Sequence, residues 1–522
     1  MIAFNPRPWL LRLATIVVAA LTLCVAALWN GQPFFYPDTP TYLRGAEMGV
    51  ARVAGAGTFK PWLPPRAQLA SRSSDTPATT GPLRQLKPLT SIEDKVVLAG
   101  RSVYYGALLY AGYLVGKFWL TVALQALSVA YLLHLLMVQL WGLRGRQVVL
   151  VAAALSLLTP LGVYAGFLMP DVFAPLVILS VGVLAVYWQQ LARKDRGTLS
   201  VLLLFGLSAH ASHLALAVLM LMAVLAARLF SARWRGLSLI GLAVVAGCIL
   251  GALAAEWTFN KVVTAAVGAP PLRLPHPMAR LIDMGPGTDY LKKNCPDAGY
   301  AACAYVQNFP TGWEDFLFSN DPAKGAFALA DVDAKRRLSD EQLGFIVDVL
   351  RHDPVGVTRG IAADVLQQLS LFRVDIWGYG TQGLEAYYAG RVPDSVLTGM
   401  QNSRAAQPSG FNYWLTIASY ATVLVSVMLA CLWWWRRARA SGSAQMAQPR
   451  RQFSDFAWIV VTGVVANAVV CATLASSLDR FQARVIWLLP FLALAVLAAA
   501  TARSISPTAA AANAAINTKP VF

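Results

Sequence analysis

Long apolar runs, separated by short polar segments, dominate the chain from end to end. A helix needs about 20 mostly apolar residues to cross the hydrocarbon layer of a membrane, and most of these runs reach that length. The pattern therefore predicts an all-α polytopic membrane protein with about ten transmembrane helices. The run at 198–209 is shorter and also fits a half-inserted helix. We expect the spans near residues 10–29, 118–140, 148–168, 172–191, 198–209, 213–230, 236–256, 411–435, 455–475 and 485–502.

Two polar segments are too long to be turns between spans. Residues 30–117 form a large loop after the first span, and its middle is rich in Gly, Pro, Ser and Thr, which is typical of a mobile loop. Residues 257–410 form an insert long enough for a small, mainly helical domain. The expected organisation is an N-terminal transmembrane module at 1–256 (seven helices), this insert, a C-terminal transmembrane module at 411–502 (three helices) and an Ala-rich disordered tail at 503–522.

Composition and charge support this interpretation. Hydrophobic residues make up 57% of the chain and charged residues 13%, with a mean hydropathy of +0.54, whereas a soluble domain carries about a quarter charged residues. The net charge of +17 is concentrated in loops at one end of alternate spans, which is the positive-inside pattern rather than a nucleic-acid-binding surface. We expect both termini in the cytoplasm, and the large loop and the insert on the outer face. The basic residues of these loops are Arg7, Arg12, Arg144, Arg146, Arg193, Lys194, Arg196, Arg228, Arg233, Arg235, Arg436, Arg437, Arg439, Arg450 and Arg451.

The first apolar run and the insert each carry a local signal. The run is too long for the core of a signal peptide and no clean cleavage site follows it, so we expect a retained anchor. In the insert, an outer, oxidising compartment favours a structural disulfide between Cys295 and Cys303 over two free thiols. Ser339 and Gln342 have capping-box spacing and predict the start of a helix. Its expected apolar face consists of Leu343, Ile346, Val347 and Leu350.

Ionisable residues recur at the outer ends of the predicted spans. A charge at membrane depth is costly and by default indicates a functional site. Arg480 and Arg484 also break the positive-inside pattern, which favours an anionic partner such as phosphate for their forked donors. The residues at the outer ends are Asp38, Asp171 in MPDVF, His210 and His213 in SAHASH, and Asp479, Arg480 and Arg484 in SSLDRFQARVIW.

Each of these residues also has a purely structural interpretation. Asp38 or Thr39 fits the N-cap of a helix whose first residue is Pro40, and Asp171 fits the cap of the fourth span. The two histidines could lie in headgroup water, because a pair at i, i+3 is weak evidence for a metal site. The two arginines could be interfacial anchors.

An acid beside aromatic residues, together with arginines suited to phosphate, indicates a specific chemistry. Glycosyl transfer from a polyprenyl-phosphate sugar needs a base for the acceptor hydroxyl, cations for the departing phosphate and a bilayer-edge site that orients both substrates. Asp38 fits the base, and Arg480 and Arg484 fit the phosphate-binding cations. Arg101 is a further phosphate candidate, or an anchor for the segment before the second span.

The chain resembles the C-type (GT-C) polytopic glycosyltransferases, nearest to the bacterial protein-mannosyltransferase and aminoarabinose-transferase-like group. The resemblance rests on the anchor helix, on Asp38 in YPDTPTYL, on the second acid in MPDVFAP, on the large outer segment and on the number of helices. It covers the helical body and the first loop but not 257–410. It implies a lipid-linked sugar donor, a place in the bacterial inner membrane, and a role for Asp38 as base or acceptor-orienting group. The family often has two acids in its first loop, whereas PDTP has one, and this departure bears on metal dependence.

The expected site has Asp38 as the catalytic group and a polyprenyl-phosphate sugar and a glycan, lipid or protein acceptor as partners. Tyr36, Phe35 and Tyr42 either wall the sugar site or belong to the aromatic belt of a membrane interface. A divalent cation is the one cofactor considered. We expect Asp171, His210 and His213 to orient the substrates. As the alternative, they hold that cation together with Asp38.

Three other functions stay open from the sequence. They are a polyprenyl-linked glycan polymerase or ligase, a transporter or flippase, and a non-catalytic envelope assembly protein. The acid directly after the first span favours the transferase over a polymerase or ligase. Transporters usually have inverted repeats and a midplane site, and neither is evident in the sequence. An assembly protein would keep the helices and lose the site.

Overall fold

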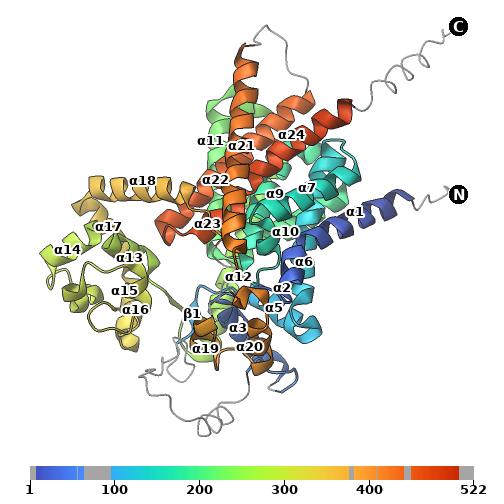
Figure 1. Cartoon of the computed structure of the whole chain (residues 1–522). Helices are drawn as coiled ribbons and strands as arrows, with labels where there is room; N and C mark the ends of the chain where they lie inside the picture. Colours follow the sequence, from blue (N-terminus) through green and yellow to red (C-terminus); the bar gives the residue numbers. More distant parts are fainter. Residues whose placement is uncertain are drawn as a thin grey trace, which may run out of the picture.

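The chain folds as a bundle of long helices with a smaller helical domain beside it (Figure 1). The computed structural model describes residues 7–55, 57–63, 96–374, 381–407, 409–439 and 448–504. Most of the Gly/Pro/Ser/Thr-rich part of the first loop and nearly all of the expected tail lie outside the described residues.

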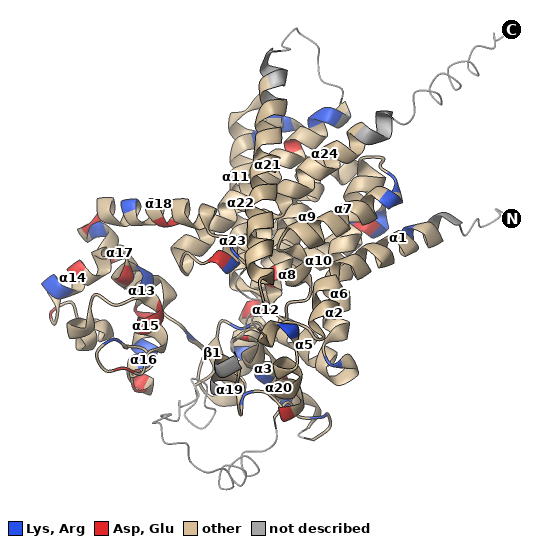
Figure 2. Ribbon diagram, viewed as in Figure 1, with Lys and Arg blue, Asp and Glu red and all other residues tan. Residues whose placement is uncertain are grey.

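Long apolar helices make up the bundle, as the hydrophobic pattern predicted. The structure is 78% helical, and the described ranges contain almost no strands, which agrees with an all-α membrane protein. Figure 2 shows that charged residues gather at the ends of the bundle and in the small domain. In the described part of the chain, seven helices have the length and apolar composition of a membrane span. They are Trp119–Leu140, Pro170–Gln190, Ala211–Phe230, Leu239–Val267, Phe411–Trp433, Arg450–Leu474 and Asp479–Ala500.

The other three predicted spans are shorter or broken. The first is interrupted at Cys24, and the third is interrupted at Thr159 and Pro160, where proline cannot donate a helical hydrogen bond. The weak prediction at 198–209 corresponds to a helix that begins in a charged turn. A total of ten spans therefore stays a prediction. The three regions form α1 (Arg7–Leu23) with α2 (Val25–Asn30), α7 (Gly145–Leu158) with α8 (Leu161–Ala165), and α10 (Arg193–Ala209).

The centre of the bundle is α9 (Phe173–Tyr187), in which every residue except Val186 is buried. A helix that is apolar all round suits this place, because protein surrounds it on every side. Small residues let its neighbours approach closely. A Cβ atom on Gly241 of α12 (Leu239–Val267) would lie 1.9 Å from the Leu184 carbonyl oxygen, so only glycine fits there. The remaining helices of the bundle are α6 (Trp119–His134), continued by the π-helix η1 (Leu135–Leu140), then α11 (Ala211–Phe230), α21 (Phe411–Arg439), α22 (Gln448–Leu474), α23 (Asp479–Ile486) and α24 (Leu488–Ser504).

A second hydrophobic core holds the small domain beyond the end of α12. Its buried residues run from Leu272 to Val357, and Val96 of the first loop joins them. The first loop is tied to this domain by two short parallel strands, β1 (Leu98–Ala99) and β2 (Leu272–Arg273). The helices of the domain are α13 (His276–Asp283), α14 (Pro286–Asn294), η5 (Ala301–Asn308), α15 (Trp313–Phe318), α16 (Val332–Asp340), α17 (Gln342–His352) and α18 (Pro354–Ser370).

Residues 372–374 and 381–406 belong to the bundle rather than to the second core. Buried residues of this segment, from Phe372 to Ala406, are part of the large hydrophobic cluster that also contains the membrane helices. The range 257–410, predicted as one insert, therefore divides between two cores. The elements packed at this end of the bundle are α3 (Thr39–Ala54), α5 (Val103–Gly116), α19 (Thr381–Tyr388) and α20 (Asp394–Gln401). We call this end, where the loop and the small domain lie, the insert end.

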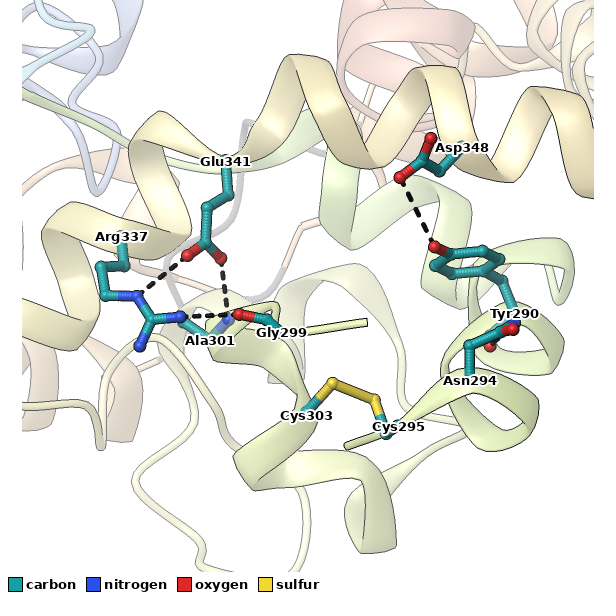
Figure 3. Close-up of a disulfide and its surroundings, with 9 residues drawn as sticks. All are labelled: Tyr290, Asn294, Cys295, Gly299, Ala301, Cys303, Arg337, Glu341 and Asp348. Atoms are coloured by element: carbon teal, nitrogen blue, oxygen red, sulfur yellow. Dashed lines mark hydrogen bonds and ion pairs between the residues drawn. A yellow bond between two sulfur atoms is a disulfide. The ribbon is translucent and has the colours of Figure 1, made fainter. Parts of the chain in front are cut away.

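The small domain contains the disulfide expected from its two cysteines. Cys295 and Cys303 are bonded, with Cα atoms 5.5 Å apart (Figure 3). The turn between them is also held by Glu341, whose carboxylate accepts hydrogen bonds from the Ala301 N–H (2.7 Å) and from Arg337 Nε (2.9 Å). Covalent and polar contacts thus fix the same turn against α16 and α17.

The predicted capping box is wrong. Ser339 lies inside α16, which ends at Asp340, so it cannot cap the next helix. Glu341 occupies the N-cap position of α17 without a side-chain cap hydrogen bond. The Ser339 hydroxyl instead accepts a hydrogen bond from the Arg273 N–H (3.2 Å). Ser339 and Gln342 have the spacing of a capping box, but Ser339 already belongs to α16.

Of the predicted apolar face of α17, only Ile346 packs against the second core. Leu343 is 77% exposed, and Val347 and Leu350 are also exposed, whereas Phe345 and Val349 on the opposite side are fully buried. The helix has apolar residues on two faces, and periodicity alone does not say which of them packs on the domain.

Candidate functional site

A short backbone pairing brings the two predicted acids together at the insert end. Phe34 forms a parallel bridge with Phe167, in which the Phe34 N–H donates to the Gly166 carbonyl and the Leu168 N–H donates to the Phe34 carbonyl, both at 2.9 Å. The Thr39 hydroxyl also donates to the Leu168 carbonyl (3.1 Å). The start of α3 is therefore fixed beside the turn that precedes α9, and these two segments carry Asp38 and Asp171.

Asp38 occupies the N-cap position of α3 but does not cap it. Its side chain makes no hydrogen bond to the helix N–H groups. It instead accepts a 2.6 Å hydrogen bond from Arg101 Nη2, and its other oxygen lies 4.0 Å from Arg480 Nη1. The side chains of Asp38 and Arg101 are 28% and 24% exposed, so this pair is open to solvent. Asp38 therefore does not cap α3. Its carboxylate is paired with Arg101 instead and stays available for a chemical role.

Asp171 likewise faces arginines rather than a helix terminus. Arg480 Nε and Nη2 donate to its two carboxylate oxygens at 3.1 and 2.7 Å, which is the bidentate geometry of an arginine–carboxylate pair. Arg484 Nη1 lies 3.5 Å from the same carboxylate. All three side chains are at least nine-tenths buried. Two arginines therefore share one acid in a setting where each charge needs a partner.

The arginine pair continues into the predicted histidine turn. Arg484 Nη2 donates to Asn467 Oδ1 (2.9 Å) and to the Ser212 hydroxyl (3.3 Å). That hydroxyl is also 2.8 Å from Nδ1 of His210. His213 is fully buried, with Nδ1 2.9 Å from the Gly206 carbonyl and with no partner for Nε2 among the described residues. His210 thus joins the network through Ser212, and His213 lies beside it, with the two ring centres 5.4 Å apart.

The three predicted aromatic residues are part of the protein interior rather than of an interfacial belt. The guanidinium carbon of Arg480 lies 4.2 Å from the centre of the Tyr36 ring, a cation–π geometry. Phe35 is buried against Phe118. Tyr42 is also buried, and its hydroxyl has no hydrogen-bond partner among the described residues. A buried hydroxyl is normally paired, so this one favours a water or ligand at the site.

Several residues that the sequence analysis did not single out hold the arginines in place. Gln368 of α18 is fully buried and pairs with the backbone of Leu478 through two hydrogen bonds of 2.9 and 3.0 Å. Arg373 binds the Asp479 carboxylate at 3.1 Å, so this predicted acid is engaged outside the network. The Tyr164 hydroxyl donates to the Arg480 carbonyl at 3.0 Å. No local sequence pattern marks these partners, because they depend on which segments meet.

The small domain reaches the site through His276. Arg101 follows β1 and His276 follows β2, and since these strands are parallel, both residues leave the pair at the same end. Nδ1 of His276 is buried without a partner among the described residues. Burial, and then the positive charge of Arg101, lower the pKa of His276 to about 4, against a weaker opposing effect of Asp38. The imidazole is therefore neutral near pH 7 and lies within the electrostatic reach of the Asp38–Arg101 pair.

The network carries an excess of positive charge. Three arginines, Arg101, Arg480 and Arg484, face two aspartates, Asp38 and Asp171, and this leaves one net positive charge. In the described ranges, no group of three His, Cys, Asp or Glu side chains could hold a metal ion. Both acids point at arginines, which disfavours the cation-binding alternative. An anion such as phosphate fits the electrostatics better.

A cavity of about 250 Å³ lies elsewhere, at the other end of the bundle. Arg12, Tyr131 and Asp195 are among its lining residues, and Asp195 accepts hydrogen bonds from Arg12 (2.7 Å) and Tyr131 (3.0 Å). None of the network residues lines it. We place the candidate site at the network because several buried charges converge there, whereas this cavity contains one satisfied ion pair.

Comparison with known proteins leaves the network as the only guide to function. The chain matches no protein-family model, no curated protein and no solved structure.

Proposed function

We propose that this chain is a membrane glycosyltransferase that moves a sugar from a polyprenyl-phosphate-linked donor to an acceptor at the outer face of the bacterial inner membrane. The observation that carries the proposal is the continuous network from Arg101 through Asp38 and Arg480 to Asp171 and Arg484. It lies where the spans meet the insert end, so a lipid tail could stay in the bilayer while the sugar phosphate reaches the charges.

The depth of each residue suggests its role. Asp38 is on the solvent side of the network, where an acceptor hydroxyl can approach. Its carboxylate takes the hydroxyl proton as the acceptor oxygen bonds to the anomeric carbon. The bond from that carbon to the phosphate oxygen breaks, and the lipid phosphate leaves with the electron pair. Arg480 and Arg484 lie deeper and stabilise the charge that develops on this phosphate.

Asp38 and Arg101 are held by helices that pack closely. A Cβ atom on Gly106 of α5 would lie 2.5 Å from the Tyr42 carbonyl of α3, so glycine is required for the observed approach. Asp38 directly precedes α3, and Arg101 precedes Ser102, the N-cap of α5. The site geometry is thus built into the contact between these two helices, which supports a preorganised role over a fortuitous ion pair.

Transfer of radiolabelled sugar from a panel of polyprenyl-phosphate donors, by purified protein in lipid vesicles, tests the proposal. Asp38→Asn should lower turnover by at least about a hundredfold, because general base catalysis contributes that much. The matched control is Asp340→Asn, an exposed acid of the small domain, which should leave turnover unchanged. Absence of transfer with every donor, or full turnover by Asp38→Asn, would contradict the proposal. Sugar–lipid movement without product would favour the flippase instead.

A further inference from the structure

The exposed apolar stripe of the small domain spans two successive helices, α17 and α18. Leu343 is 77% exposed, Val355 75% and Leu366 70%, although all three lie in a folded domain with its own core. Several large exposed apolar side chains on neighbouring helices of a folded domain are typical of an interaction site.

The stripe is one-sided in both helices. At about 100° per residue, Leu343, Val347 and Leu350 fall within about 60° of one another, opposite the buried Phe345 and Val349. The sequence pattern of α17 therefore describes a real apolar face, and this face points out of the domain.

In α18 the same construction repeats. Val355, Ala362 and Leu366 share one side of the helix, opposite the buried Val357 and Gln368. Arg359 lies on the exposed side as well, where a long side chain can bring its charge to water beside an apolar surface. An apolar face with a flanking cation is typical of a helix that lies in a membrane interface.

The position of α18 relative to the spans is fixed by hydrogen bonds. Gln368 pairs with Leu478, and the Ser477 hydroxyl donates to the Asp364 carbonyl at 3.0 Å. Ser477 and Leu478 lie in the turn between α22 and α23, where two apolar spans end. The Tyr420 hydroxyl of α21 also donates to the Ser370 carbonyl at 2.6 Å. One end of α18 is therefore attached to the turn between α22 and α23 and to the side of α21.

From this attachment α18 runs away from the bundle. Figure 1 shows α18 extending sideways from the bundle, roughly perpendicular to α21, with α13 to α17 below it. A helix of 17 residues is about 25 Å long. The stripe therefore extends sideways from the turn in which α22 ends and α23 begins.

We propose that α17 and α18 lie on the lipid bilayer at the insert end, with Leu343, Val355 and Leu366 in the boundary between headgroups and acyl chains. The small domain is then attached to the membrane surface as well as to the bundle. This keeps His276 and the first-loop strands at a fixed height above the bilayer. The inference rests on the apolar stripe and its attachment to the spans, and it holds whether or not the chain is a glycosyltransferase.

Photo-crosslinking in lipid nanodiscs tests this placement. The photoreactive residue p-benzoylphenylalanine would replace Leu343 or Leu366 in the full chain, and lipid adducts would be measured by mass spectrometry. Leu424, an exposed residue of α21, is the lipid-facing control, and Lys324, an exposed polar residue of the small domain, is the water-facing control. Adduct yield at Leu343 and Leu366 should be at least about tenfold that at Lys324 and close to that at Leu424.

Two outcomes would overturn the inference. Lipid adducts at Leu343 and Leu366 no more frequent than at Lys324 would show that the stripe faces water. Crosslinks from these positions to a second copy of the chain, in place of lipid, would show that protein covers it. Because the label replaces an exposed side chain, neither substitution disturbs the buried face of its helix.

Discussion

The two aspartates of the network should respond very differently to the same substitution. Asp171 is 1% exposed and is the only acid within 4 Å of Arg484 among the described ion pairs. Asp171→Asn keeps the side-chain volume but leaves the buried Arg484 without a counter-charge among the described residues, and it leaves Arg480 with only Asp38, 4.0 Å away. Breaking a buried ion pair by removing one partner costs about 3–5 kcal/mol. Asp38 is 28% exposed, and loss of such a partly exposed pair costs up to about 1 kcal/mol.

Equilibrium unfolding in detergent, followed by tryptophan fluorescence, measures this difference. We expect Asp171→Asn to lose about 3 kcal/mol more than Asp38→Asn. A cycle with Arg480→Gln tests the mechanism: since the two residues interact directly, the double variant should lose less than the sum of the single losses by at least about 1 kcal/mol. Asp340→Asn on the surface of α16 is the control for a neutral substitution.

An Asp171→Asn variant whose free energy of unfolding lies within about 1 kcal/mol of that of the wild type would contradict this expectation. That result would mean that solvent or lipid headgroups reach the arginines and that the network is not buried. Additive losses in the cycle would instead show that Arg480 and Asp171 stabilise the bundle independently.

Three further predictions concern the elements around the network. Gly106→Ala should push α5 away from the Tyr42 carbonyl and cost about 1–3 kcal/mol in the same unfolding assay; a silent substitution would show that the helices are free to separate. Replacing both Cys295 and Cys303 with serine should lower the stability of the small domain by about 2–3 kcal/mol, seen as faster limited proteolysis within it, and unchanged proteolysis would contradict this. Folding lowers the pKa of His276 from 6.5 to about 4, so the unfolded chain binds the proton first as the pH falls. The contribution of His276 to the free energy of unfolding should be fully present above pH 6.5 and decline by up to about 3 kcal/mol between pH 6.5 and 4. His276→Gln should lack this decline, and an equal decline in both proteins would assign it to other groups.

The sequence by itself determined the membrane body. A span must keep apolar side chains against lipid over a fixed length, so its signal is local and readable. The disulfide between Cys295 and Cys303 was also predictable from the sequence, because these two cysteines are only eight residues apart and the other cysteines lie in the predicted spans. Whether α10 and the interrupted first and third runs cross the membrane was harder to predict. A short or broken apolar run lacks the length signal of a span, and its place depends on how it packs against neighbouring helices.

The site was predictable in its residue types but not in its connections. The sequence indicated Asp38, Asp171, Arg480 and Arg484 because charges at the ends of spans are costly there. It did not show that Arg101 would pair with Asp38, since that contact depends on how α5 packs against α3. An aspartate before a helix could either cap the helix or form an ion pair. Only the positions of its neighbours in the structure decided between these two roles.

Two features were decided by the tertiary structure alone. His276 is one histidine among many polar residues of the small domain, and it joins the network because two short strands pair in parallel. The apolar residues of α17 are periodic on two faces, and the domain buries Phe345 and Val349 while it leaves Leu343 outside. Hydrophobic periodicity predicts which faces of a helix are apolar. Which of these faces is buried depends on packing against segments far apart in the chain.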